Sequence, residues 1–188
     1  PNSGEFCLRC HTPKGWLESR SQAADGSSLT ADDISNGVAC LTCHRMIDTV
    51  ASPNDEAAAI DSLVRQALTA QGNLPPGGTT GSAMTIIDPS DNRRGPFSLA
   101  ASFGYHSAKR TDLLGQNGSA VTRSRICGSC HNLSNPLLSW DAGRGQYWPN
   151  PSNQKAADFS SEKIFPIERT FDEWALSTYA NGGVIDYR

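Results

Sequence analysis

Aromatic and other large apolar side chains are scarce in this sequence. Hydrophobic residues make up 37% and aromatic residues only 7% of the 188 positions, while 17 glycines and 11 prolines favour irregular backbone. Because folding is driven mainly by the burial of apolar surface, such a chain has little material for a core of its own. We therefore expect bound apolar groups to complete the core, and the chain without them to be largely unfolded.

Long apolar runs and clusters of basic residues are also missing. No stretch approaches the ~18 consecutive apolar residues of a membrane-spanning helix, so we expect no membrane span in this chain. Lysine and arginine total 16 against 19 acidic residues, which gives a formal charge of -3. The basic residues form no dense run, and this pattern excludes nucleic acid and anionic membranes as expected partners.

All six cysteines lie in three copies of the motif Cys-x-x-Cys-His, at residues 7–11, 40–44 and 127–131. This motif is the attachment signature of c-type heme. Two thiols three positions apart can form thioethers to one porphyrin, and the histidine that follows can bind the iron from one face. We therefore expect three covalently attached heme c groups. The predicted attachment residues are Cys7, Cys10, His11, Cys40, Cys43, His44, Cys127, Cys130 and His131.

Three other uses of paired cysteines explain the pattern less well. A zinc ribbon needs two cysteine pairs and has no use for a histidine after each pair, and three pairs leave one unmatched. A thioredoxin-like redox motif is normally single and belongs to a βαβ unit. Structural disulfides close long loops, which tight Cys-x-x-Cys pairs do not.

Histidine is scarce outside the motifs, since the chain has only four. Three heme irons have six axial positions, and the motif histidines would fill three of them. His106 is the remaining histidine, and we expect it to be a second axial ligand. Met84 is the next candidate, with packing as its alternative; Met46 either reaches a heme other than that of its own motif or packs as a gap filler. The expected iron ligands are His11, His44, His131, His106 and Met84.

Several arginines lie near the motifs or ahead of His106. Some of them are expected to pair with heme propionates, although a solvated arginine is equally common. No single one is favoured by the sequence. These arginines are Arg9, Arg45, Arg93, Arg94, Arg123 and Arg125.

Helix signals outnumber strand signals along the chain. A capping-box pattern at residues 30–33 predicts a short helix leading to Cys40. A second helix is predicted from residue 52 to residue 72, with an apolar stripe that favours packing in the core. A final helix is predicted after a further capping box at residues 170–173. Segments 72–98 and 141–166 are predicted to be loops, with one strand-like run at 84–87.

These elements predict a mainly α fold with much irregular loop and little sheet, wrapped around the hemes of a multiheme cytochrome c. We place a soft domain boundary near residue 75. Residues 1–75 would form a two-heme segment with its following helix. Residues 76–188 would form a loop, the third-heme segment and a C-terminal helix, and the two parts can also form one unit.

The third motif and its surroundings form an extended pattern that resembles a known family. The pattern consists of His106, the run 125–132 around the motif and the run 168–174. It is similar to bacterial multiheme c-type cytochromes, and closest to the tetraheme nitrifier cytochrome and its hydroxylamine-oxidoreductase-like relatives. The resemblance implies closely spaced hemes with mostly two histidine ligands each. It also implies that His106 binds the iron of a neighbouring heme.

Together these features predict electron transfer by an exported triheme c-type cytochrome, with no catalytic residue of its own. Its expected partners are other redox proteins or cytochrome subunits. The shortage of histidines leaves two alternatives open: a subunit of a larger assembly or filament that shares ligands across interfaces, or a heme enzyme with one open iron. Covalent heme is attached after export, which places the protein in the periplasm or outside the cell. The chain begins at Pro1 without a methionine, as a processed or incomplete product would.

Overall fold

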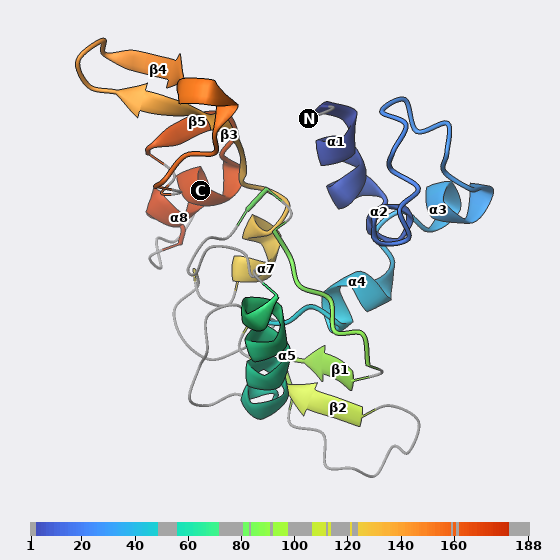
Figure 1. Ribbon diagram of the computed structural model, residues 1–188. Helices are drawn as coiled ribbons and strands as arrows, with labels where there is room; N and C mark the ends of the chain where they lie inside the picture. The colour runs from blue at the N-terminus through green and yellow to red at the C-terminus, as the bar shows by residue number, and fades with distance from the viewer. Residues whose placement is uncertain are drawn as a thin grey trace, which may run out of the picture.

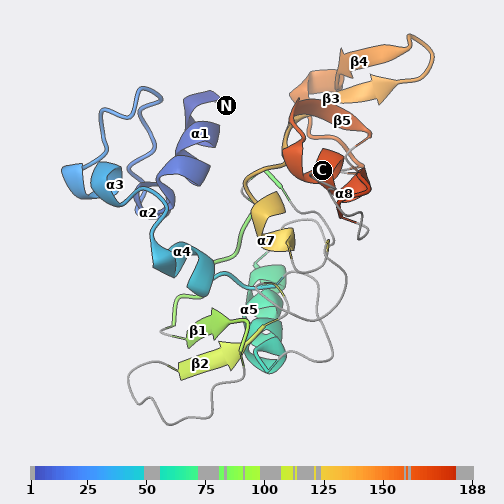
Figure 2. The same cartoon turned by 180° about the vertical axis from the view of Figure 1, so that it is seen from behind.

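The computed structural model describes most of the chain (Figure 1). The described residues are 3–48, 56–71, 81–82, 84–90, 92–97, 107–111, 124–158 and 162–180, with the single positions 113, 121 and 160. In both views the N-terminal helices and the C-terminal sheet lie on opposite sides of the molecule (Figure 1 and Figure 2). A helix and two short strands from the middle of the chain lie below them.

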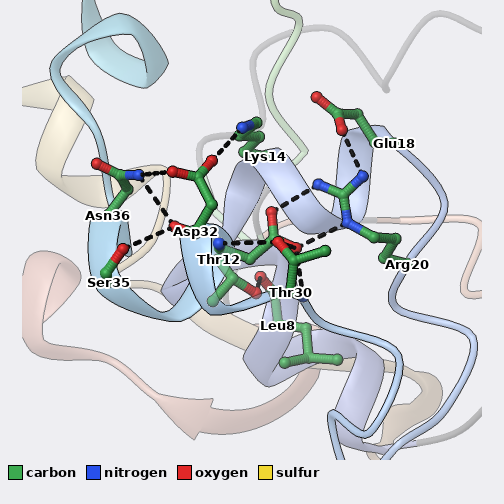
Figure 3. Close-up of polar contacts among 10 residues, drawn as sticks. Leu8, Thr12, Lys14, Glu18, Arg20, Thr30, Asp32, Ser35 and Asn36 are labelled. Carbon is green, nitrogen blue, oxygen red and sulfur yellow. Dashed lines mark hydrogen bonds and ion pairs between the residues drawn. The ribbon is translucent and has the colours of Figure 1, made fainter.

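The N-terminal segment contains four short helices: α1 (Ser3–His11), α2 (Pro13–Leu17), α3 (Ala31–Asn36) and α4 (Cys40–His44). The predicted capping box is confirmed. The Thr30 hydroxyl accepts a hydrogen bond from the backbone N–H of Asp33, and the Asp33 carboxylate accepts one from the N–H of Thr30. Arg20 donates to both oxygens of the buried Asp33, and an exposed ion pair joins Lys14 to Asp32 (Figure 3). These contacts tie α2 to α3.

The middle of the chain contains helix α5 (Ala58–Ala70) and strands β1 (Asn92–Gly95) and β2 (Ser107–Arg110). The two strands pair in parallel. The backbone N–H of Ala57 donates to the carbonyl of Arg110, so the start of α5 is fixed to the end of β2. Helix α4 lies directly above β1 in both views (Figure 1 and Figure 2).

The C-terminal part consists of α7 (Arg125–Gly128), β3 (Leu133–Asp141), β4 (Gln146–Pro149), the 3-10 helix η2 (Pro151–Asn153), β5 (Ile164–Glu168) and α8 (Thr170–Leu176). Strand β3 pairs antiparallel with β4 on one side and with β5 on the other. On this sheet the ring of Tyr147 meets the rings of Trp140 and Phe165 edge to face. Helix α8 packs its buried Phe171 against Gly128 of α7.

Some buried apolar residues of the described part of the chain join distant segments. Met46 pairs with Ile87 in an isolated bridge, and the N–H of Ile47 donates to the carbonyl of Ile86. The strand-like run at 84–87 is therefore limited to this bridge. Among the residues that the structure describes, the buried apolar side chains are Met46, Ile47, Ala57, Ile86, Leu113, Ala156, Ile164, Phe171 and Ala180.

The prediction of a mainly α fold with little sheet is wrong. The structure contains two sheets, and the longest strand, β3, covers nine residues. Prolines at positions 136, 149 and 166 hid the strands, since proline cannot donate to a sheet ladder. Pro149 and Pro166 lie in the edge strands β4 and β5, where a missing donor is tolerated. Pro136 lies in the central strand, at the register shift between Asn135 and Ser139.

Two predicted helices differ from the structure in length or packing. Helix α5 begins at Ala58, after residues 49–55, which lie outside the described part of the chain. Its apolar stripe is only partly covered: Leu63 is 66% exposed, whereas Ile60, Val64 and Leu68 are half-buried. The fully buried side chain of this helix is that of Asp61. Helix α8 ends at Leu176, and its N-cap is Arg169, without the side-chain bond that a capping box at Thr170 would make.

Contacts cross the soft boundary near residue 75, among them those of Met46 and Ile47 with the 86–87 segment. They do not decide between one domain and two, and the division into 1–75 and 76–188 stays a prediction. Within the described residues no helix is long and apolar enough to cross a membrane.

Candidate functional site

Each Cys-x-x-Cys-His motif forms a single helical turn. The first motif is the last turn of α1, and the second is the whole of α4. In the third, which starts in α7, the N–H of His131 donates to the carbonyl of Cys127 at 2.8 Å. Side chains three positions apart on a helix lie on the same face, so the two thiols of each motif are neighbours.

The three motifs share one pattern of exposure. In each, the first cysteine is exposed, the second is partly buried and the histidine is exposed. None of the six cysteines is joined to another in a disulfide. The thiols and imidazoles are therefore open to chemistry at the surface of the folded chain.

Thiols of different motifs lie close to one another. A contact between the thiols of Cys10 and Cys130 raises the pKa of Cys10, and the same contact lowers the pKa of Cys130 to about 7. Burial raises the pKa of Cys43, to which the nearby Cys130 and Cys127 also contribute. Helices α1, α4 and α7 lie around one central region in both views (Figure 1 and Figure 2). The fold thus gathers three motifs that are far apart in sequence.

The imidazole of His44 has a defined orientation. Its Nδ1 lies 2.6 Å from the backbone carbonyl oxygen of Arg94 in β1. Because a carbonyl only accepts hydrogen bonds, Nδ1 carries the proton, and in the neutral ring Nε2 is then the nitrogen with the lone pair. Nε2 has no hydrogen-bond partner within the described part of the chain. Metal-binding histidines are commonly oriented in this way by a bond from their other ring nitrogen.

Behind this carbonyl lies a buried cluster of three charged side chains, Asp61, Arg94 and Asp88, which we call the buried cluster. Arg94 is 1% exposed and Asp88 is 0% exposed. The guanidinium of Arg94 donates to Asp61 Oδ1 at 2.6 and 2.9 Å and to Asp88 Oδ2 at 2.7 Å. Elements α5, β1 and the 84–90 segment are joined through this one side chain.

The two carboxylates of the buried cluster differ in acidity. Burial raises the pKa of Asp61, and the hydrogen bonds from Arg94 offset this only in part. Burial also opposes the charged form of Asp88, but bonds from Arg94, the N–H of Ser90 and the amide of Asn92 outweigh it and lower its pKa. Asp88 is therefore the more firmly ionised partner of Arg94.

A cavity of about 450 Å³ lies beside α4. Leu41 and Thr42, the two residues between the cysteines of the second motif, contribute to its wall. The rest of the wall is formed by Lys14, Leu17, Glu18, Ala39, Arg45, Ile87, Asp88 and Pro89. Most of the exposed cavity surface is apolar, and the lining includes two basic side chains, Lys14 and Arg45, and two acidic ones, Glu18 and Asp88.

The candidate second iron ligands, His106, Met84 and Met46, differ in what the structure shows of them. His106 lies outside the described residues. Met84 is partly buried, and its backbone N–H donates to the carbonyl of Gly81; its role as an iron ligand stays a prediction. Met46 is 4% exposed, and its sulfur accepts a hydrogen bond from the Ser129 hydroxyl at 3.6 Å. Met46 therefore packs against the third motif.

The expectation of three covalently attached heme c groups is contradicted. In the part of the chain that the structure describes, no group of three or more His, Cys, Asp or Glu side chains could hold a metal ion. The physical reason is that the motif histidines are exposed on their own turns and are not assembled with further ligands there. In the second motif, Cys40, Cys43 and the oriented imidazole of His44 occupy one turn.

Asp61 and Asp88 were not among the predicted site residues, and Arg94 was considered only as a possible partner of a heme propionate. Arg94 was one of six arginines with equal standing, and Asp61 interrupts the apolar stripe of α5 without seeming part of any motif. An acidic residue on the inner face of a helix was the signal that could have revealed the pairing of Asp61 with Arg94.

Comparisons with models of protein families, with curated proteins and with solved structures find no match to this chain.

Proposed function

We propose that this chain transfers electrons as an exported protein of the c-type cytochrome kind. The observation that carries the proposal is the second motif. Cys40, Cys43 and His44 lie on one turn, and the Nδ1–H of His44 is held by a backbone carbonyl so that Nε2 is left as a metal ligand. The number of hemes is left open. The resemblance of the sequence to multiheme cytochromes is part of this proposed function.

The chain's own residues have simple tasks in this function. The thiols of a motif anchor the group, and the histidine supplies one ligand to the iron. A heme bound in this way supplies one-electron redox chemistry. The approach of Cys10, Cys43 and Cys130 to one another supports a relay, since electron transfer is fastest between groups that are close. Its electron partners would be other redox proteins, in the periplasm or outside the cell.

A second candidate is a subunit of a larger assembly that shares ligands across interfaces. It is favoured by the exposure of His11, His44 and His131 on three separate turns. An exposed motif histidine leaves the surroundings of its turn open to a neighbouring chain. Both candidates use the motif residues in the same way. In the first the purified chain transfers electrons alone, and in the second it needs a partner subunit.

The test is to produce the chain with export in a bacterial host that can attach c-type heme, and in the same host without that capacity. The mass of the denatured, reduced protein is then measured. The proposal predicts a mass increase of a whole number of heme groups only in the competent host. A mass equal to the bare polypeptide in both hosts would overturn it.

Variants assign the attachment sites in the same experiment. The double change Cys40→Ser and Cys43→Ser should remove one heme from the measured mass. The matched control is Ser28→Ala with Ser35→Ala, which changes two exposed small polar residues outside the motifs and should leave the mass increase intact. Loss of heme in the control as well would mean that folding, not attachment, limits the result.

A further inference from the structure

We propose that the buried cluster of Asp61, Arg94 and Asp88 is a positioning device for His44. The inference rests on the proposed function, because it concerns how the imidazole is held as a metal ligand. Arg94 acts through its backbone carbonyl, which receives the Nδ1–H of His44. Its side chain fixes that carbonyl by binding two buried carboxylates.

The contacts form a closed ring that begins and ends at the second motif. Arg45, which follows His44, donates from its guanidinium to the carbonyl of Asp88, and its own carbonyl accepts the N–H of Asp88 at 2.9 Å. The Asp88 carboxylate holds the Arg94 guanidinium. The Arg94 carbonyl then holds the His44 ring. Each member is thus fixed from two sides, so the imidazole cannot turn without breaking the ring.

Stability alone is a poor explanation for this cluster. Buried ion pairs give little net stability, because removing charges from water costs about as much as their attraction returns. The cluster holds two carboxylates against one guanidinium and is almost fully buried. A hydrophobic group of similar size could fill the space, but it could not bind Asp61 and Asp88 and so tie β1 to α5 and to the 84–90 segment. The geometry of His44 is what the cluster supplies.

The same cluster reaches the third motif. The N–H of Asp48 donates to Asp61 Oδ2 at 3.3 Å, and Arg125 donates to Asp48 Oδ2 at 2.7 Å. Arg125 is the first residue of α7, two positions before Cys127. The orientation of His44 and the placement of the third motif are therefore set by one connected network.

The test is the exchange of the His44 Nδ1 proton with solvent. The full-length exported protein is labelled with 15N-histidine and measured by NMR in the reduced state. Arg94→Lys keeps the positive charge but loses the planar fork that binds both carboxylates. We expect exchange at least ten-fold faster than in the wild type. Asp88→Asn, a milder change, should shift the rate in the same direction.

The matched control is Arg20→Lys, which makes the same change in the Arg20–Asp33 pair, away from His44. It should leave the His44 exchange rate unchanged. The inference is overturned if Arg94→Lys and Asp88→Asn fold and keep the wild-type rate. It is also overturned if both fail to fold while Arg20→Lys folds, because the cluster would then be a purely structural element.

The redox potential of the heme-loaded protein distinguishes a positioning role of the buried cluster from a purely structural one. A hydrogen bond from Nδ1 makes the imidazole a better donor and favours ferric iron. In Arg94→Lys the potential of one centre should therefore rise, by about 59 mV for a ten-fold change in relative affinity, with other centres unchanged. If the wild type carries no covalent heme, the proposed function fails, and the proton exchange rate still decides this inference.

Discussion

At the scale of single residues, Thr30 and Asp33 show how side chains replace missing helix hydrogen bonds. Each caps the backbone of the other at the start of α3. We predict that Thr30→Ala lowers the free energy of unfolding by about 1 kcal/mol, the usual effect of losing an N-cap. Urea unfolding followed by circular dichroism measures this. Ser28→Ala, a nearby exposed position, is the control, and an equal loss there would contradict the prediction.

The lowered pKa of Asp33 should make the stability of the protein depend on pH. The hydrogen bonds from Arg20 hold the pKa of Asp33 well below its usual range, and the N–H of Thr30 adds to the effect. A carboxylate with a lowered pKa in the folded state stabilises the fold above its ordinary pKa near 4, and this contribution is lost as the pH falls further. Stability should therefore drop between about pH 5 and the acid limit, and less so in Asp33→Asn.

The check is the unfolding midpoint of both proteins across this pH range. Asp32→Asn is the control, because the Asp32–Lys14 ion pair is exposed to solvent. An acid dependence in Asp33→Asn equal to that of the wild type would show that other groups are responsible. Asp61 has the opposite effect on the pH dependence of stability. Its pKa is raised by burial, so protonation of this carboxylate at low pH favours the folded state.

At the scale of elements, the contact of α7 with α8 depends on a glycine. A Cβ at Gly128 would lie 2.7 Å from the ring of Phe171. We predict that Gly128→Ala destabilises the protein by about 1–3 kcal/mol through overpacking. The matched control is Gly95→Ala, since a Cβ at Gly95 meets nothing within 4 Å. Thermal unfolding distinguishes them, and equal stability of the two variants would contradict the packing.

The C-terminal sheet depends on its central aromatic contact. Tyr147 meets Trp140 at 5.2 Å and Phe165 at 5.4 Å between ring centroids, and these rings come from three strands. Tyr147→Ala removes both contacts, each worth about 0.5–1.5 kcal/mol beyond simple burial. We expect a clear loss of stability in urea. Tyr179→Ala, at an exposed position after α8, should cost much less.

Local signals along the sequence predicted some elements well. The capping box of α3 was found because it depends on four consecutive residues. The helical turns of the motifs are likewise local. The three-stranded sheet was missed because its pairing joins distant residues and its prolines lie at edges and at a bulge.

At the scale of the whole molecule, the candidate site depends on contacts between distant parts of the chain. His44 meets Arg94 fifty positions away, and Arg125 meets Asp48 across seventy-seven. No spacing rule predicts such pairs. The motif residues could be named from the sequence because their chemistry is contained in five positions, whereas the cluster that orients one of them could not.

The central claim, that this chain carries electrons through its Cys-x-x-Cys-His turns, is tested most directly by a redox titration of the purified, exported protein followed by absorption. We expect a reversible heme absorption change in the folded protein, and we expect the heme to stay with the polypeptide when non-covalent pigment is extracted with acid. We also expect that one component disappears when Cys40 and Cys43 are replaced by serine. A protein without any reversible visible absorption change, or one whose change is unaffected by that replacement, would contradict it.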